Sequence, residues 1–410
     1  MLIKFKEILN KKGDRLFLSA ADASATQIQD PNKHSEVFML DFLIEGFTQL
    51  TIPQVAMWFI GGLLIYLAIK KDMEPALLLP MGFGAILVNL PLSPVIKEGS
   101  GIISSLFAVG IEASEAMPLL LFIGIGAMID FGPLLTNPKL FILGGAAQFG
   151  IFITVLFAAM IGFPLTDAAS IGIIGAADGP TAIHVANTLD SQYLSAIVVV
   201  AYSYMALVPI VQPIVIKMCT TKKERMIRMQ YASGEISQAT RIMFPIIVTI
   251  ISGLIAPESL SLVGMLMFGN LIRECGVLKS LSDTAQTVFA NIITLLLGIT
   301  IAFQMQADKF LRIETLIIMV LGLFAFVFDT IGGVMCAKVL NLFSKNKINP
   351  MIGAAGISAF PMAARVVQKM GLKEDSSNHL LMHAVGANVS GQIASAVVGG
   401  LIIGLVTKLL

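Results

Sequence analysis

The stretch Gly175-Ala176-Ala177-Asp178-Gly179-Pro180-Thr181 places a carboxylate inside an apolar run and interrupts the helix around it. An ionised aspartate at the centre of a bilayer costs about 2.5 to 3.5 kcal/mol even on insertion scales, so it is normally kept to bind or relay an ion. Pro180 lacks a backbone donor and frees carbonyl groups that lipid cannot solvate. A cation would satisfy the carboxylate and the carbonyls together, so the stretch predicts a cation site at a helix break.

The composition around this stretch is that of a membrane protein. Of 410 residues, 56% are hydrophobic and only 13% are charged, and the mean hydropathy is +0.87. One soluble core does not need so much apolar sequence. The net charge of +1 argues against a nucleic-acid surface. Three scattered cysteines (Cys219, Cys275 and Cys336) favour neither a disulfide framework nor a metal cluster, so Na⁺ is the one metal ion expected.

Apolar runs long enough to span a bilayer, about 20 residues each, recur along the chain. Shorter runs are interrupted by Gly, Pro or a polar residue, and counting them gives about nine to eleven transmembrane segments. The long runs lie near 53–70, 139–163, 191–216, 242–263, 287–305, 313–342 and 380–407. The sequence therefore predicts an all-α polytopic membrane protein.

The charged residues suggest how the chain is organised. Residues 1–48 are a polar N-terminal extension without the apolar core of a signal peptide. Residues 49–216 form a first membrane repeat whose broken helix contains Asp178, and residues 242–410 form a second. The loop 217–241 between them is placed in the cytoplasm by its excess of basic residues, which are Lys217, Lys222, Lys223, Arg225, Arg228 and Arg241 against Glu224 and Glu235.

The chain repeats a short motif in its two halves. Ile174-Gly-Ala-Ala177 recurs as Ile352-Gly-Ala-Ala355, and a long apolar run precedes and follows each copy. Matching breaks in two halves are the best sequence signal of a site between inverted repeats. We therefore expect two inverted repeats whose broken helices meet at an ion site in the midplane of the membrane.

The second broken segment, 349–365, offers neutral ligands and one fixed charge. Asn349 and Ser358 carry neutral oxygens, and Pro350 and Pro361 free carbonyl groups near both ends. Hard cations such as Na⁺ bind several oxygens at close range. Arg365 has two readings: its guanidinium suits a carboxylate in a bidentate grip, or it snorkels to the interface.

Two further apolar runs contribute polar candidates. Asn388 lies between Gly386 and Gly391, where an amide can face a cavity, whereas His379 and His383 lack a third ligand for a metal site. Either Tyr202 or Tyr204 can be an interfacial anchor, and Tyr204, which precedes Pro209, is the one expected to reach the interior and pass a proton. Other carboxylates adjoin the ends of runs and predict capping or interfacial roles; they are Asp130, Asp329, Glu112 and Glu115.

Several of these motifs resemble the beta subunit of the sodium-translocating carboxylic-acid decarboxylases. The resemblance covers roughly residues 50–410, and the polar start is a departure from it. The motifs are Gly175-Ala-Ala-Asp-Gly-Pro-Thr-Ala-Ile183, Asn349-Pro-Met-Ile-Gly-Ala-Ala-Gly-Ile-Ser358, Phe360-Pro-Met-Ala-Ala-Arg365, Leu381-Met-His-Ala-Val-Gly-Ala-Asn-Val389, Ile65-Tyr-Leu-Ala-Ile-Lys-Lys71, Leu79-Pro-Met-Gly-Phe-Gly-Ala-Ile-Leu87 and Gly124-Ile-Gly-Ala-Met-Ile-Asp-Phe-Gly-Pro133.

The resemblance implies a function and a set of site residues. A beta subunit of this family decarboxylates carboxybiotin, pumps Na⁺ outward and consumes a proton. The catalytic residues implied are Asp178, Tyr204 and Arg365, with Arg365 holding the carboxylate of carboxybiotin. The Na⁺ ligands implied are Asp178, Asn349, Gly353, Ser358 and Asn388. Asp178 would hold Na⁺ or, alternately, the proton.

The same resemblance implies partners and a location. The carboxybiotin comes from a biotin carrier protein, loaded by a carboxyltransferase (alpha) subunit, and a small membrane-anchor (gamma or delta) subunit completes the complex. The chain is expected to be a homo-oligomer in the bacterial plasma membrane. Broken helices at a midplane site would equally suit a secondary sodium and carboxylate symporter that works alone. A passive anchor is a poor alternative, because an anchor needs no intramembrane Asp or Asn.

Overall fold

The computed structural model describes residues 45–71, 73–229 and 236–410, so expectations for residues 1–44 and for 230–235 of the basic loop lie outside the described residues. The described residues form helices and no strand. Residues Leu50–Leu410 group into one compact unit. The all-α fold predicted from the composition is confirmed.

Seven of the described helices are long and apolar enough to cross a membrane. An eighth span arises if the bent pair Ile102–Glu112 and Ala116–Met128, which meet at 67°, counts as one. Two shorter apolar helices, Pro75–Val88 and Leu165–Ala176, lie outside this count, so the described residues give seven or eight spans where the sequence predicts about nine to eleven. The seven are Ile52–Lys71 (α3), Leu140–Ile161 (α8 and α9), Leu194–Cys219 (α12), Gln238–Ile255 (α14), Lys279–Met305 (α16 and α17), Ile313–Phe343 (α19) and Leu381–Leu409 (α22). The chain is a multi-pass membrane protein.

Most of the other helices are short, and two of the seven spans consist of shorter pieces, α8 with α9 and α16 with α17. These short pieces include both segments that the sequence predicts as broken. In chain order the pieces are α4 (Pro75–Val88), α5 (Ile102–Phe107), α6 (Ala116–Met128), α7 (Gly132–Thr136), α8 (Leu140–Ala146), α9 (Phe149–Ile161), α10 (Leu165–Gly172), α11 (Gly179–Thr188), α13 (Lys222–Arg225), α15 (Leu260–Glu274), α16 (Lys279–Thr284), α17 (Ala290–Ile301), α18 (Ala307–Phe310), α20 (Met351–Ala354) and α21 (Met362–Glu374).

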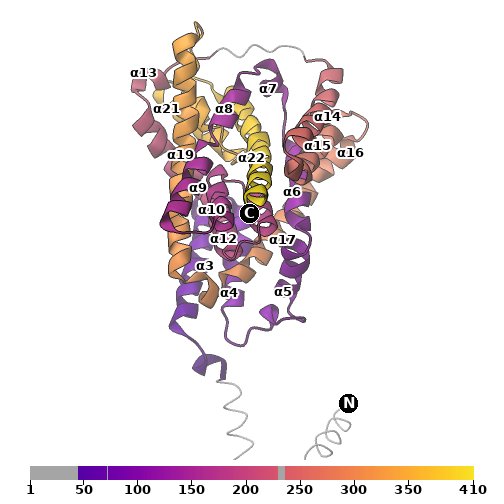
Figure 1. Cartoon of the computed structure of the whole chain (residues 1–410), viewed down its shortest axis with the longest axis vertical. Helices are drawn as coiled ribbons and strands as arrows, with labels where there is room; N and C mark the ends of the chain where they lie inside the picture. The colour runs from indigo at the N-terminus through magenta and orange to yellow at the C-terminus, as the bar shows by residue number, and fades with distance from the viewer. Residues whose placement is uncertain (1–44, 72, 230–235) are drawn as a thin grey trace, which may run out of the picture. The chain divides into compact units, whose positions relative to one another are not determined.

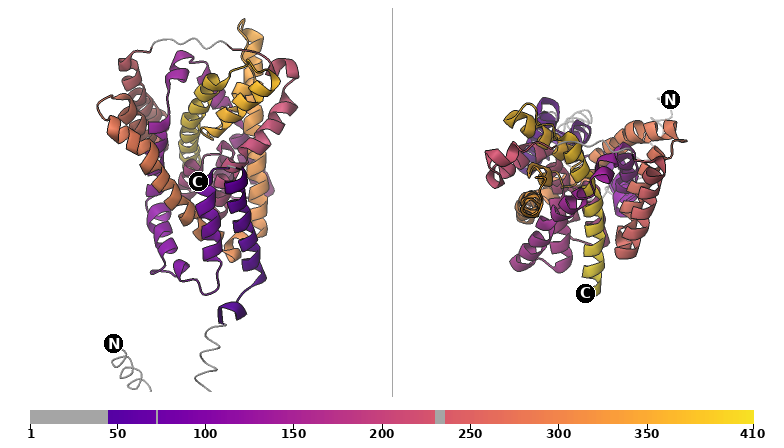
Figure 2. Two further views of the ribbon diagram at one scale, coloured as in Figure 1. Left: turned by 180° about the vertical axis from the view of Figure 1, so that it is seen from behind. Right: turned by 90° about the horizontal axis from the view of Figure 1, so that it is seen from above.

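Helix α22 lies between two groups of helices (Figures 1 and 2). One group contains α9, α19 and α21, and the other contains α6, α14 and α15. Along its length α22 contacts α7, α8, α11, α21 and the 3₁₀ turn Pro257–Ser259. Because one long helix touches these separate parts in turn, its residue numbers give their order across the molecule.

Glycines let the second broken segment pack backbone to backbone. A Cβ on Gly353 (α20) would collide with the carbonyl group of Gly333 (α19), and the reverse also holds. A Cβ on Gly391 (α22) would collide with the carbonyl group of Gly356. Small residues at such crossings let helices in a membrane approach closely. Helices α19 and α22 therefore fix the position of this segment.

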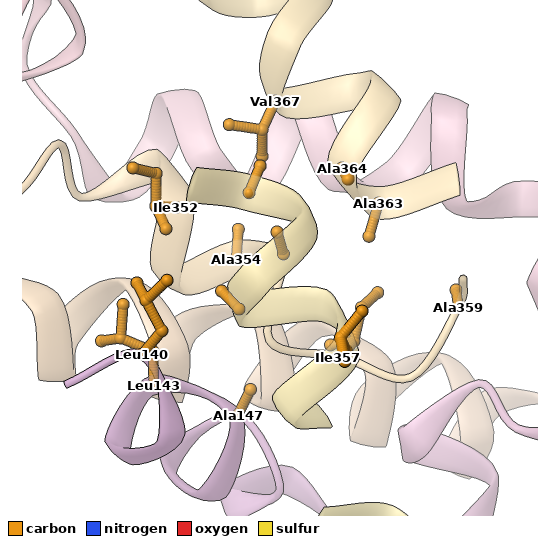
Figure 3. Close-up of a cluster of buried hydrophobic side chains, with 14 of the residues drawn as sticks. Leu140, Leu143, Ala147, Ile352, Ala354, Ile357, Ala359, Ala363, Ala364 and Val367 are labelled. Carbon is orange, nitrogen blue, oxygen red and sulfur yellow. The ribbon is translucent and has the colours of Figure 1, made fainter. Parts of the chain in front are cut away.

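Apolar side chains enclose the same segment. Figure 3 shows Leu140 and Leu143 of α8 near Ile352 of α20, with Ala354 and Val367 close by. All five side chains are fully buried. The second broken segment is thus held in a packed core, which keeps its unwound backbone away from lipid, as a bilayer requires.

Candidate functional site

Asp178 lies at the break that the sequence predicts. Helix α10 continues into a 3₁₀ turn, Ile173–Ala176, and Ala177 then takes a left-handed conformation with φ of 52°. Asp178 is the N-cap residue of α11, and Pro180 follows within the first two positions of that helix. Aspartate is a preferred N-cap and proline suits the first turn, where no backbone donor is needed. The local sequence therefore stops one helix and starts the next at Asp178.

The carboxylate of Asp178 is buried and surrounded by neutral donors. Its Oδ2 accepts hydrogen bonds from Thr181 Oγ1 at 2.8 Å, Ser395 Oγ at 2.8 Å and Gln392 Nε2 at 3.1 Å. Its Oδ1 accepts only a longer bond, 3.4 Å from the backbone N of Thr181. In the described part of the chain, no Lys, Arg or His forms an ion pair with Asp178. A buried charge without a countercharge is costly, so a bound cation or a proton is the available compensation.

The two broken segments touch each other. After α20 the chain is unwound as far as Pro361, and the backbone N of Ser358 donates to the carbonyl oxygen of Ala176 at 3.0 Å. The Ser358 hydroxyl donates to the carbonyl oxygen of Gly391 in α22 at 3.2 Å. Asn388, also in α22, donates from its amide to the carbonyl oxygen of Ile357 at 2.6 Å. Ser358 and Asn388 are therefore brought to the same junction as Asp178.

Oxygen atoms without partners accompany this junction. Within the described residues, Asn388 Oδ1, Gln148 Oε1 and the Tyr202 hydroxyl are buried and have no hydrogen-bond partner. Gln148 donates to the carbonyl oxygens of Gly144 at 3.1 Å and Gly356 at 3.4 Å, so its side chain reaches the second broken segment. A buried polar atom left unpaired costs about 1 to 3 kcal/mol. Oxygen ligands for a cation are therefore available in the region.

Asn349 and Gly353 have other contacts. The Asn349 amide donates to the carbonyl oxygens of Arg225 at 2.9 Å and Ile227 at 2.8 Å, and its Oδ1 accepts from the backbone N of Met351 at 3.1 Å. Gly353 packs against the backbone of α19. Asn349 thus ties the segment after α13 to the start of the second broken segment, and its hydrogen bonds do not reach Asp178.

The two tyrosines of α12 face different neighbours. The Tyr204 hydroxyl donates to the carbonyl oxygen of Met319 in α19. The ring of Tyr202 lies where a Cβ of Gly179 would be, directly after Asp178. Tyr202 is therefore the tyrosine beside the Asp178 break, whereas the hydroxyl of the predicted Tyr204 is used in the contact with α19.

Arg365 is exposed in the first turns of α21. Among the described residues it forms no ion pair or hydrogen bond of its side chain. At the other end of α21, Glu374 is paired with Arg225 at 2.7 Å, and Asn378 donates to the carbonyl oxygen of Arg225 at 3.0 Å. Within the described part of the chain Arg365 is thus an unpaired guanidinium, and it lies close in sequence to the second break.

Sequence reasoning missed three of the donors around Asp178: Thr181, Gln392 and Ser395. A signal for two of them was present, because Asn388, Gln392 and Ser395 recur at i, i+4 and i+7 on one face of α22. Thr181 follows Asp178 by three residues, the position where an N-cap side chain meets the helix. Reading each apolar run for a polar face would have found all three residues.

The fold and this site together define the class of protein. It is a multi-pass membrane protein that encloses an ionisable residue between broken helices, the arrangement with which such proteins hold a transported ion. A family model described as the Na⁺-transporting oxaloacetate decarboxylase beta subunit matches residues 53–406. The chain belongs to this family, and it is a membrane subunit of an Na⁺-transporting decarboxylase.

Curated relatives agree with this membership over most of their length. A methylmalonyl-CoA decarboxylase subunit beta from Veillonella parvula is 47% identical over 363 residues, which covers 88% of this chain and 96% of the relative. One from Propionigenium modestum is 46% identical over 390 residues, covering 90% and 98%. A probable oxaloacetate decarboxylase beta chain from Vibrio cholerae is 44% identical over 419 residues, covering 87% and 96%.

Proposed function

We propose that this subunit decarboxylates carboxybiotin and couples the reaction to outward transport of Na⁺, with consumption of a proton. The carboxybiotin is carried by a partner protein and is not attached to this chain. In the chemical step the bond between the ring nitrogen and the carboxylate carbon breaks, CO₂ leaves, and the nitrogen takes up a proton. The proton consumed in this step provides the link between chemistry and transport.

The observation that carries the proposal is the buried Asp178 carboxylate, which has neutral donors and no ion-pair partner among the residues that the structure describes. Such a group is stable with a proton or with a cation. If proton and Na⁺ compete for it, binding of one lowers the affinity for the other, and this reciprocal effect is the coupling that a pump needs. Simultaneous occupancy would move charge without linking it to decarboxylation.

Within this proposal the residues divide into three groups. Asp178, Ser358 and Asn388 contact Na⁺, because their positions and the unpaired Oδ1 of Asn388 offer oxygen ligands at the junction of the two breaks. Asn349 and Gly353, the other expected ligands, hold the second broken segment in place through the contacts described above.

The third group serves carboxybiotin and the proton. Arg365 binds the carboxylate of carboxybiotin, a role suited to a guanidinium that is exposed and has no side-chain partner among the described residues. Tyr204 passes a proton at a position that is not in contact with Asp178. The two halves of the chain are inverted repeats, and the basic loop 217–241 faces the cytoplasm, where the carboxyltransferase and the biotin carrier approach. A small anchor subunit and further copies of this chain complete the complex.

The test uses the purified complex in proteoliposomes. Carboxybiotin on the carrier protein is added with and without Na⁺, and release of CO₂ is followed together with uptake of ²²Na⁺. We expect turnover to require Na⁺ and to drive its accumulation. Na⁺ flux with no loss of carboxybiotin would instead favour a sodium and carboxylate symporter, and CO₂ release without Na⁺ uptake would remove the pump from the proposal.

A further inference from the structure

A second buried cluster of ionisable groups lies on the helix that begins at Asp178. His184 of α11 and Glu115, which precedes α6, meet at 2.6 Å between Nδ1 and Oε2. Both side chains are only 11% exposed. Asn187 of α11 donates to Glu115 Oε1 at 2.8 Å. The sequence predicts a capping or interfacial role for Glu115; the residue is the N-cap of α6 but its side chain makes no cap hydrogen bond, and its carboxylate pairs with a histidine from a distant part of the chain.

The other ring nitrogen of His184 shows which protons the pair holds. Nε2 lies 3.1 Å from the carbonyl oxygen of Glu258, which can only accept, so Nε2 carries a proton. The 2.6 Å contact with Glu115 needs a further proton between Nδ1 and Oε2. Loss of either proton would leave a lone pair facing an acceptor. The two oxygens that face the ring therefore favour the protonated form of the pair.

The deprotonated form also has a partner ready. The Ser261 hydroxyl lies 3.3 Å from His184 Nε2, and a hydroxyl can donate as well as accept. When Nε2 loses its proton, Ser261 can turn its own hydrogen toward the ring. Both states of the histidine are therefore accommodated at Nε2, which is what a site that binds and releases a proton requires.

The contacts along α22 show that the His184 pair lies on the side of Asp178 that is farther from the basic loop. Asn378, just before α22, donates to the carbonyl oxygen of Arg225 in that loop. Gln392 and Ser395 bond Asp178. A Cβ on Gly400 would collide with Ser259, which adjoins the Glu258 that His184 contacts. The order along α22 is thus the basic loop, then Asp178, then the His184 pair.

Helix α11 itself connects the two sites. Polar residues recur every third position along it, at Asp178, Thr181, His184 and Asn187. Positions three apart are neighbours on a helix surface. His184 lies six positions after Asp178, a rise of about 9 Å along a helix. Thr181, whose hydroxyl donates to Asp178, lies midway between them in the sequence.

We propose that Glu115 and His184 form a second proton-binding site, on the outer side of Asp178, which supplies the proton that replaces Na⁺ there. The proposal rests on the proposed function above. In the step, the N–H bond at His184 Nε2 breaks, the proton passes by water and the Thr181 hydroxyl, and an O–H bond forms on Asp178 as Na⁺ leaves outward. Outer water then returns a proton to Nε2. One proton moves inward for each Na⁺ released in this step.

The charged groups around the pair come from several elements. Glu112 and Glu115 precede α6, and Glu258 belongs to the 3₁₀ turn before α15. The carboxylate of Asp167 in α10 accepts hydrogen bonds from the Ser191 hydroxyl at 2.6 Å and from the Gln192 amide at 2.9 Å. From α12 Tyr202 packs on the start of α11, and α22 contributes neutral Gln392 and Ser395. No Lys or Arg in the described residues pairs with Glu115.

The experiment varies the pH on the outer side alone. The complex is reconstituted with its cytoplasmic face outward, the lumen is buffered at a series of pH values, and the external pH is fixed. CO₂ release from carboxybiotin on the carrier protein and ²²Na⁺ uptake are measured. With the wild type we expect both rates to fall as lumenal pH rises, by up to about tenfold per pH unit once the pair loses its proton. Rates independent of lumenal pH would overturn the proposal without any variant.

Variants then test whether this pair causes the dependence. His184→Gln and Glu115→Gln should each remove the response to lumenal pH, and the double variant should do no more than either one, since one proton is shared. Asp167→Asn is the matched control, because it neutralises a buried carboxylate with two side-chain donors on the neighbouring α10 and should keep the wild-type response. If His184→Gln does not assemble, Glu115→Asp keeps the carboxylate and should keep the response with a shifted midpoint.

The outcomes separate this proposal from the one on which it rests. Wild-type complex that does not couple CO₂ release to Na⁺ uptake would refute the proposed function. Coupled wild type, together with pair variants that retain the wild-type response to lumenal pH, would refute only the second proton site. Loss of the response in the pair variants and in Asp167→Asn alike would indicate a general packing effect, and that too would overturn the assignment.

Discussion

The two broken segments of this protein differ in charge although they meet at one junction. The first, 173–181, contains the buried Asp178, whose Oδ2 accepts three side-chain hydrogen bonds. The second, 349–361, has no ionisable side chain, and its carbonyl oxygens at Gly356 and Ile357 accept from Gln148 and Asn388. Both segments interrupt a helix, yet only the first brings a charge into the core.

This difference teaches how the site can change its occupant. The Asp178 carboxylate offers one negative charge that one proton or one Na⁺ can neutralise. A second buried acid, Asp329 of α19, lies against Gly175 of the same segment, and its Oδ1 accepts from the backbone N of Gly150 and of Ile151. Neutral oxygens from the other segment can bind a cation but do not hold a proton at neutral pH. The first segment therefore decides whether the site is charged, and the second adds ligands that favour the metal ion.

Removing the charge from the first segment should have the largest effect. Asp178→Asn keeps the shape of the side chain but gives neither a proton site nor a negative ligand. We expect CO₂ release and ²²Na⁺ uptake in proteoliposomes to fall together by at least about a hundredfold, the scale of a lost proton-transfer group. Asp167→Asn serves as the control for a buried carboxylate elsewhere. Na⁺-stimulated turnover retained by Asp178→Asn would remove Asp178 from the mechanism.

A smaller effect is expected from one donor to that carboxylate. Ser395→Ala removes a hydrogen bond to a group that is charged when Na⁺ binds, a loss of about 1.5 kcal/mol. The ionised form becomes less favourable, so the proton competes better and the half-saturating Na⁺ concentration should rise about tenfold. Ser390→Ala, on the same helix, removes a hydrogen bond to the carbonyl oxygen of Phe141 and should change the half-saturating Na⁺ concentration little. Equal shifts in both variants would contradict the comparison.

The sequence alone was sufficient for the class, the helical fold and the break at Asp178. A charge and a Pro inside an apolar run are local signals, because neither is tolerated in lipid without compensation. Ser358 and Asn388, which the sequence selects as neutral oxygens in Gly-rich segments, also lie at the junction with Asp178.

What the sequence did not reveal depends on contacts between distant segments. Tyr202 and Tyr204 are two residues apart on α12, and only the packing of α19 and of Gly179 decides which one lies beside Asp178. The partner of Glu115 is His184, 69 residues further along the chain. No local pattern links such residues, so the second cluster on α11 required the fold.

The smallest effect on Na⁺ is expected in the second segment, at Asn349. Its two amide hydrogens go to the carbonyl oxygens of Arg225 and Ile227, and its oxygen accepts from Met351. Asn349→Ala should therefore loosen the segment after α13 and lower the thermal stability of the complex by about 1 to 2 kcal/mol, while the half-saturating Na⁺ concentration stays within about twofold, since less than 0.5 kcal/mol of binding energy is at stake. Thermal unfolding and Na⁺-dependent CO₂ release of the same sample measure both quantities. A tenfold rise in half-saturating Na⁺ with unchanged stability would return Asn349 to the ligands, and the second segment would then contribute to binding as directly as the first.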